Sequence, residues 1–341
     1  MSEFFFMYGL FIAKVITGLI ALVFVVAIIG GGRKKELSSE LKVTNLNKKY
    51  TDLQNNVMQA VMDKKEFKQR HKTQSKLEKK NKKLNQSTNA KPKLFVLEFD
   101  GDIKATEVST MRDEVTALLS VAEPQDEVLM KLDNSGGIVH EHGLAASQLQ
   151  RIKDAKLTFT ISVDKVAASG GYMMACVADK IVAAPFAILG SIGVLAQLPN
   201  FNRLLDKAGV DFEQHTAGEY KRTVTMFGKN TEKEREKLKI DLQETHTLFR
   251  DFVVEHRPKL DMDKVATGEH WYGKQALELN LVDELKTSDE FLIDALDSYD
   301  IYQIEMQQKK GFQEKFLGGL FASFKSLRNS MAAEQNDSRF L

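Results

Sequence analysis

The sequence lacks the several cysteines of a disulfide-stapled protein and the excess of basic residues that is typical of a nucleic-acid-binding protein. Cys176 is the single cysteine among 341 residues, so no disulfide forms within the chain and the fold rests on core packing. The 48 Lys and Arg residues are balanced by 47 Asp and Glu residues, and a net charge of +1 gives no reason to expect nucleic acid as a partner. An apolar content of 43% is ordinary for a globular chain.

Charge is also absent between Val15 and Gly32, and the apolar run extends back to Phe4. A run of this length is sufficient to cross a bilayer as a helix. A cleaved secretory signal begins with basic residues and ends at a small-residue cleavage site, whereas this segment begins MSEFFF and ends at the basic residues 33–35. We therefore expect a retained transmembrane anchor over residues 8–32.

Residues 33–92 are polar and rich in lysine, with few aromatic side chains. Such a segment cannot bury a core of its own, so we expect a solvated helix or a flexible connector. Electrostatic attachment to anionic lipid headgroups is an alternative, because clustered lysines beside a membrane helix are attracted to them. The shortage of aromatic residues disfavours binding of single-stranded nucleic acid by base stacking.

Residues 93–300 alternate short apolar runs with segments of helical spacing, which predicts an α/β domain with a largely parallel sheet. The expected strands begin at Leu94, Val128, Leu157 and Lys180, and the expected helices cover 107–119, 143–152, 169–178 and 231–257. The uncharged segment 181–198 resembles a second membrane span. Because Pro185, Gly190 and Gly193 interrupt it, we interpret it as buried strands and a loop.

Hydrolysis of an amide needs a nucleophile, a proton acceptor and donors for the oxyanion. Ser169 lies where a strand ends and a helix begins, with Gly170 and Gly171 leaving access to its hydroxyl. A serine in this position is ordinarily an N-cap. A second turn, KLDNSGGIVH, offers the backbone N–H groups of Gly136 and Gly137 to a substrate carbonyl.

His140 and His142 follow this second turn, and with Asp133 they permit a Ser-His-Asp triad or a metal site to be drawn. Neither is favoured. Two histidines separated by one residue point to the same side in a strand, whereas here a helix is expected to begin.

Five motifs follow one another along the chain: DNSGG at 133–137, VDKVAASGGYMMACVADKI at 163–181, APFAILGSIGV at 184–194, HTAGEYKR at 215–222 and ATGEHWYGKQA at 266–276. In this combination the sequence resembles the SppA/SohB family of serine peptidases, which are similar to signal peptide peptidase A. The likeness covers the anchor, the connector and the catalytic region to about residue 300, and about the last thirty residues match least.

The resemblance implies a catalytic domain of the Clp protease/crotonase type over residues 93–300, in which Ser169 attacks the peptide carbonyl. The lysine that accepts its proton in the family corresponds to Lys221. Ser191 corresponds to a hydroxyl that orients this lysine, and Gly136 with the N–H of Gly170 corresponds to the oxyanion hole. One departure is Ser135, where relatives often have proline.

A lysine acts as a base near neutral pH when desolvation lowers its pKa, so we expect Lys221 to be buried in the working enzyme. The resemblance further implies peptide or unfolded, membrane-derived substrates, no cofactor, and a ring-shaped homo-oligomer in the bacterial inner membrane. The basic residues 33–35 favour a cytoplasmic catalytic domain, whereas relatives are often described on the outer side, so the side stays open.

Two other functions share parts of this pattern. A crotonase-type acyl-CoA enzyme has the fold but does not need Ser169 or Lys221, and a degenerate membrane scaffold would have lost one of them. The tail, residues 301–341, has phenylalanines and lysines at the spacing of an amphipathic helix, which predicts either subunit docking or contact with a membrane.

Overall fold

The computed structural model describes residues 4, 6–18, 39–70, 72, 73, 76 and 91–308. Contacts divide the chain into two compact units, one formed by Leu41–Met306 and the other by the two ends of the chain. Within the described part of the second unit, residues 6–18 are helical and exposed. None of the helices among the described residues combines the length and the apolar character needed to cross a bilayer. Residues 19–32 of the expected anchor and 309–341 of the expected amphipathic tail lie outside the described residues.

A ten-stranded sheet organises the described residues of the larger unit. Its main path runs β1-β10-β2-β3-β4-β6-β9, and β5, β7 and β8 branch from it beside β3. The pairs from β10 to β9 are parallel, as the sequence predicts, and β7 pairs with β8 in the antiparallel direction. The bounds are β1 Ser39–Asn45, β2 Lys93–Gly101, β3 Glu127–Asn134, β4 Thr158–Val163, β5 Val166–Ala168, β6 Lys180–Ala183, β7 Ile188–Gly190, β8 His270–Tyr272, β9 Glu284–Leu285 and β10 Asp300–Gln308.

The central strands are buried on both faces, which is why their sequences are nearly continuous apolar runs. In β2, every residue from Leu94 to Leu97 is buried, and β4 is buried from Phe159 to Val163. The four strands expected from these runs are confirmed. Register places Asn134, the last residue of β3, beside Gly101 of β2 and Ala167 of β5.

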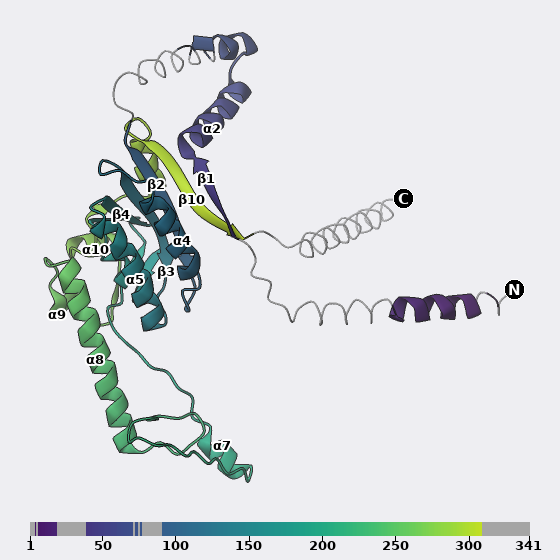
Figure 1. Ribbon diagram of the computed structural model, residues 1–341, viewed down its shortest axis with the longest axis vertical. Helices are drawn as coiled ribbons and strands as arrows, with labels where there is room; N and C mark the ends of the chain where they lie inside the picture. Colours follow the sequence, from purple (N-terminus) through teal and green to yellow (C-terminus); the bar gives the residue numbers. More distant parts are fainter. Residues whose placement is uncertain are drawn as a thin grey trace, which may run out of the picture. The chain divides into compact units, whose positions relative to one another are not determined.

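Helices α4 (Val108–Leu119), α5 (Val139–Asp154) and α6 (Gly170–Ala175) pack against these strands and against one another. In Figure 1, α4 and α5 lie along one side of the strands. All three helices fall within or around the segments that the helical spacing predicts. Shorter helices complete the body: α9 Met262–Val265, α10 Gly273–Glu278 and α11 Ser288–Ala295.

The expected long helix is confirmed as α8, Glu232–His256. Thr231 and Glu234 form a reciprocal capping box at its start, which satisfies backbone donors that a helix N-terminus leaves unpaired. Between β7 and α8 the chain forms a projection, residues 194–231, that contains α7 (Asn202–Lys207) and that we call the arm. Figure 1 shows the arm at the N-terminal end of α8, away from the strands.

The uncharged segment 181–198 belongs to the core over its first two thirds. Ile181, Leu189 and Ile192 are fully buried in or next to β6 and β7. From Val194 the segment leaves the body and enters the arm, where Leu195 is 75% exposed. The interpretation as strands and a loop, with no membrane span, is therefore confirmed.

Two boundaries of the expected domains lie elsewhere in the structure. Residues 39–50, which the sequence assigns to the connector, supply β1 and the start of α2 (Leu46–Val61). Leu46 is buried, and the Asn47 side chain donates to the carbonyls of Leu296 and Tyr299 and accepts from the N–H of Ile301. Residues 301–308, assigned to the tail, form β10. Their polar composition concealed both segments: β1 lies at the edge of the sheet, and β10 lies between β1 and β2.

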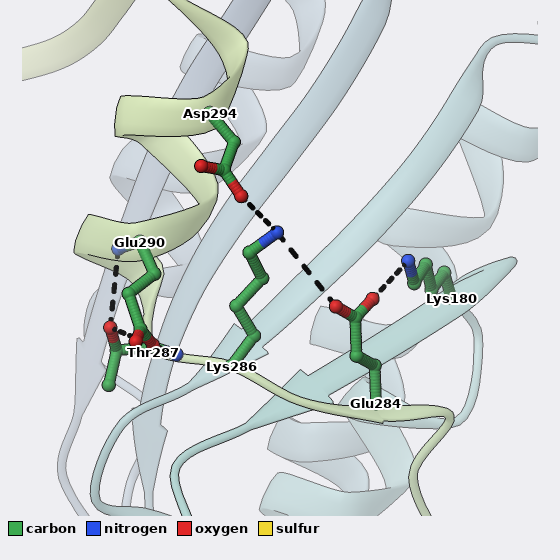
Figure 2. A network of polar contacts seen from close by, with 6 residues as sticks. All are labelled: Lys180, Glu284, Lys286, Thr287, Glu290 and Asp294. Carbon is green, nitrogen blue, oxygen red and sulfur yellow. Dashed lines mark hydrogen bonds and ion pairs between the residues drawn. The ribbon is translucent and has the colours of Figure 1, made fainter.

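An ion-pair network joins β6, β9 and α11 (Figure 2). Lys180 binds Glu284 across 2.6 Å, and Lys286 contacts both Glu284 and Asp294. Thr287 forms a capping box with Glu290 at the start of α11. These half-buried contacts hold the last strand of the parallel series and the helix that follows it.

Candidate active site

Ser169 occupies a strained turn between β5 and α6. Its backbone has φ +54° and ψ −118°, a conformation that L side chains seldom adopt and that clusters at functional sites. Its N–H donates to the carbonyl of Gly190 across 2.7 Å. Although Ser169 is the N-cap of α6, its side chain forms no capping hydrogen bond, so the ordinary structural role of a helix-starting serine is not the one it has here.

Gly136 lies directly against this serine. It has φ +87°, and a Cβ built on it would stand 2.7 Å from the Ser169 Cβ and 2.9 Å from the Gly170 nitrogen. A side chain at this position would therefore collide with the Ser169 turn. Gly170 is the first residue of α6, so its N–H lacks an acceptor within the helix.

Ser191 is held beside the same turn by backbone hydrogen bonds. It follows Gly190, has φ +52°, and donates its N–H to the carbonyl of Glu269 across 2.7 Å. The parallel pairing of β5 with β7 brings Ala168 next to Gly190. The structure thus assembles Ser169, Gly136, Gly170 and Ser191 at the ends of adjacent strands.

Lys221 lies elsewhere, in the arm. Its side chain is exposed, and among the described residues it makes no side-chain hydrogen bond or ion pair; its backbone N–H donates to Gly218. The expected burial of Lys221 is therefore not found within the single chain. The physical reason is that the arm extends away from the body, so the chain itself does not cover this lysine (Figure 1).

The arm nevertheless has a defined local structure. Phe201, Phe212 and Phe227 pack with ring centroids about 6 Å apart, and Asn200 donates to the carbonyls of Thr225 and Gly228. Next to Lys221, Glu219 binds Lys233 of α8 across 2.7 Å, and Tyr220 lies under Lys233 and Lys237. Lys221 lines an open pocket of about 780 Å³ together with arm residues such as Leu198, Phe212 and His215.

The alternative triad and metal site receive no support from the geometry. Asp133 pairs with Lys165 across 2.7 Å, and this hydrogen bond raises the pKa of Lys165. His140 is exposed, whereas His142 is buried in α5 and contacts Asn134. Across the described part of the chain, no cluster of His, Cys, Asp and Glu side chains is arranged to hold a metal ion.

Asn134 is a site residue that the sequence did not single out. Its side chain accepts the Gly136 N–H across 2.7 Å and donates to the carbonyl of Gly101 across 3.0 Å. The one sequence signal was its place in the DNSGG motif, immediately before the two glycines.

Two family models match the chain. Residues 3–149 match the model of "Peptidase family S49 N-terminal", and residues 151–300 match the model of "Peptidase family S49". The two matches meet within α5 and together include every candidate site residue named above.

Similar chains carry the name of a probable protease. "Probable protease SohB" of Buchnera aphidicola subsp. Acyrthosiphon pisum is 49% identical over 311 residues, covering 91% of this chain and 92% of the relative. "Probable protease SohB" of Haemophilus influenzae is 47% identical over 320 residues, covering 91% of each chain. The chain therefore belongs to peptidase family S49.

Proposed function

We propose that the chain is a membrane-anchored serine endopeptidase with a Clp protease/crotonase-like catalytic domain and a Ser-Lys dyad. The observation that supports this best is the Ser169 turn: a strained serine whose hydroxyl does not cap the helix, lying against Gly136 at the edge of a parallel sheet. A serine held this way presents its Oγ to a carbonyl, as in the strand-to-helix turns of other serine hydrolases.

In the proposed reaction, the neutral amine of Lys221 accepts the proton of the Ser169 hydroxyl while Oγ attacks the substrate carbonyl carbon. The tetrahedral oxyanion collapses, the peptide C–N bond breaks, and the leaving amine takes the proton from Lys221. An acyl-enzyme on Ser169 remains. Water, deprotonated by Lys221, attacks the ester, releases the acid and regenerates the serine. Ser191 orients the lysine by a hydrogen bond.

Backbone N–H groups would stabilise the oxyanion, and the two turns next to Ser169 offer them. The N–H of Gly170 begins α6. The N–H of Gly136 already donates to Asn134, so Gly136 reaches an oxyanion only as a shared donor. The N–H of Gly137 has no hydrogen bond among the described residues, and we include it with Gly136 and Gly170 in the proposed oxyanion hole.

Assembly would supply the burial that Lys221 lacks. Large apolar side chains are exposed on the arm, including Leu195 (75%), Leu204 (63%) and Tyr220 (52%). Exposed apolar groups on one segment are typical of an interaction surface. We propose that chains form a ring in which the arm of one subunit carries Lys221 to the Ser169 turn of its neighbour.

The proposed anchor is residues 8–32, in the bacterial inner membrane, and the proposed substrates are peptides, unfolded chains and membrane-derived segments. Their support is the uncharged N-terminal run and the resemblance of the chain to the SppA/SohB family. The basic residues 33–35 favour a cytoplasmic body. Alkaline phosphatase activity of a reporter fused after residue 92 would place the body on the outer side instead.

The function is tested by hydrolysis of unstructured peptides by the detergent-solubilised full chain. Ser169→Ala and Lys221→Ala are expected to lower kcat by about 10³-fold or more while the proteins stay folded and assembled. Ser147→Ala on α5 and Lys229→Ala on the arm, both exposed positions, serve as matched controls and keep the parental rate. Parental activity in either dyad variant would contradict the proposal.

A further inference from the structure

The Asn134 side chain has a fixed orientation at the end of β3. Its Nδ2 donates to the Gly101 carbonyl across 3.0 Å, and its Oδ1 accepts the Gly136 N–H across 2.7 Å. If the side-chain amide were flipped, Oδ1 would face the Gly101 carbonyl oxygen and Nδ2 would face the Gly136 N–H, and neither pair could form a hydrogen bond. The two backbone partners therefore decide that Oδ1 faces the turn.

Glycines make the space for this side chain. A Cβ at Gly101 would stand 2.4 Å from Asn134 Nδ2, and a Cβ at Gly171 would stand 2.2 Å from the Asn134 carbonyl oxygen. Asn134 is 1% exposed. It is thus enclosed between the end of β2, the turn that contains Gly136 and the start of α6.

His142 also belongs to this hydrogen-bond network, and both of its ring nitrogens face oxygen atoms. It is fully buried, and its Nδ1 lies 2.9 Å from the carbonyl oxygen of Ile138, while its Nε2 lies 3.0 Å from Asn134 Oδ1. Both partners are oxygens that only accept hydrogen bonds. The ring satisfies both contacts only when each of its nitrogens carries a proton.

The same ring touches the other half of the proposed oxyanion hole. A Cβ built on Gly170 would stand 2.4 Å from His142 Cγ, so the ring fills the space left by that glycine. His142 therefore packs against Gly170 on one side and, through Asn134, holds the N–H of Gly136 on the other.

We infer that His142 is a positioning residue for peptide hydrolysis, and that it holds the Gly136 and Gly170 turns in register through Asn134 when the ring is protonated on both nitrogens. The inference rests on the proposed function for its kinetic consequence. A neutral ring would set a nitrogen lone pair against an oxygen at one of the two contacts. The turn that carries Gly136 would then lose the arrangement that accepts the oxyanion.

Several other ionisable side chains lie on the elements that pack near the His142 ring. Tyr172 on α6, which packs against α5, and Cys176 directly after α6 are ionisable, and burial raises the pKa of each, so both stay neutral. On α4, Glu114 accepts the N–H of Met306. No ion pair to His142 is found among the described residues, so the charge on its ring is met by two neutral oxygens.

The test compares kcat and KM for the full chain, His142→Gln and His140→Gln. His142→Gln should have kcat lowered about tenfold with KM unchanged, a smaller loss than removal of a whole oxyanion donor. His140→Gln, exposed two residues away, keeps the parental kcat and KM.

A second measurement does not depend on catalysis or on a variant at position 142. In Ser169→Ala protein with ¹⁵N-labelled histidine, both ring nitrogens of His142 should carry protons under the assay conditions, because both face oxygen atoms that accept hydrogen bonds. A parental kcat in His142→Gln, a change confined to KM, or a bare ring nitrogen would overturn the inference. An inactive parent with a doubly protonated His142 would instead contradict only the proposed function.

Discussion

The N–H of Ser169 donates to the carbonyl of Gly190 across 2.7 Å. This bond ties the proposed nucleophile to the residue that precedes Ser191, whose own N–H donates to Glu269. Two positive-φ serines are therefore held in place by the backbone of β7 and by the segment leading into β8. The site is built first from main-chain hydrogen bonds, and the side chains follow from them.

Replacing Gly190 should disturb both serines. Gly190 has φ +90°, and a Cβ on it would stand 3.3 Å from the Glu269 carbonyl oxygen. We expect Gly190→Ala to lower the free energy of unfolding by about 1–3 kcal/mol, as measured by denaturant titration. Gly143→Ala is the control, because it lies within α5 with open space at its Cβ and should stabilise the protein by about 0.5–1 kcal/mol. Equal effects of the two changes would refute the strain argument.

Arg257 should be a main support of the body around α6. Its guanidinium binds both Asp283 oxygens across 2.8 Å, and its side chain is 11% exposed. Burial raises the pKa of Asp283, but hydrogen bonds from Arg257 and the Ile181 N–H outweigh it, so the pKa of Asp283 is lowered. We expect Arg257→Ala to cost about 2–3 kcal/mol of unfolding free energy, less than for a fully buried pair because Asp283 is 35% exposed.

Because the folded-state pKa of Asp283 is lowered, this stabilisation is present above the ordinary aspartate range and is lost as pH falls through the folded pKa. The difference between parent and Arg257→Ala should therefore shrink below about pH 4. The control, Arg250→Ala, breaks a pair with Asp263, which is 90% exposed, and should cost less than about 1 kcal/mol. A cost for Arg257→Ala no larger than that of the control would contradict the prediction.

Glu114 should destabilise the protein when it is ionised. It is 6% exposed, and burial raises its pKa despite the hydrogen bond from the Met306 N–H. A carboxyl whose folded-state pKa is raised loses stability as pH rises from its unfolded pKa to its folded pKa. Glu114→Gln keeps the acceptor for Met306 and has no charge to bury, so it should unfold at higher denaturant concentration than the parent at pH 7.

At a pH below the ordinary glutamate value of about 4.3, the parent is protonated and the advantage of Glu114→Gln should disappear. Thermal or denaturant unfolding at both pH values measures the difference. Glu107→Gln serves as the comparison, because burial also raises the pKa of Glu107. If Glu114→Gln is less stable than the parent at pH 7, the prediction is contradicted, because the contacts of the ionised carboxylate then stabilise the folded protein.

Mixing inactive subunits tests whether the arm completes a neighbour's site. Ser169→Ala chains keep Lys221, and Lys221→Ala chains keep Ser169. If each site takes its serine and lysine from adjacent subunits of a ring, coexpression of equal amounts should restore roughly a quarter of the parental activity. Mixtures as inactive as the separate variants would locate both residues in one chain.

The sequence predicts the parallel strands and the Ser169 turn because each depends on local pattern. Apolar runs such as Leu94 to Leu97 indicate strands buried on both faces, and glycines mark where the backbone must pass Ser169. Strands β1 and β10 were not separated from their polar flanks. β1 is the edge strand and buries little, and β10, which lies between β1 and β2, has mainly polar residues around the buried Ile301 and Ile304, so both have a weak periodic signal. Those two segments needed the structure.

Two features of the site depend on contacts that sequence spacing does not encode. The position of Lys221 is set by an arm that packs on its own phenylalanines and on α8, so its distance from Ser169 in the sequence carried no information about exposure. The role of Asn134 and His142 arises from the register of β3 with β2 and from the packing of α5 on α6. Both are tertiary relationships.

The most direct test of the account is mass spectrometry of the protein after acid quenching of its reaction with an activated peptide ester. The account predicts an acyl group on Ser169, absent from Ser169→Ala and formed more slowly in Lys221→Ala, with the parent returning to its original mass as the ester is hydrolysed. An acyl group on another residue, or peptide hydrolysis that continues in Ser169→Ala, would contradict the central claim that Ser169 is the nucleophile.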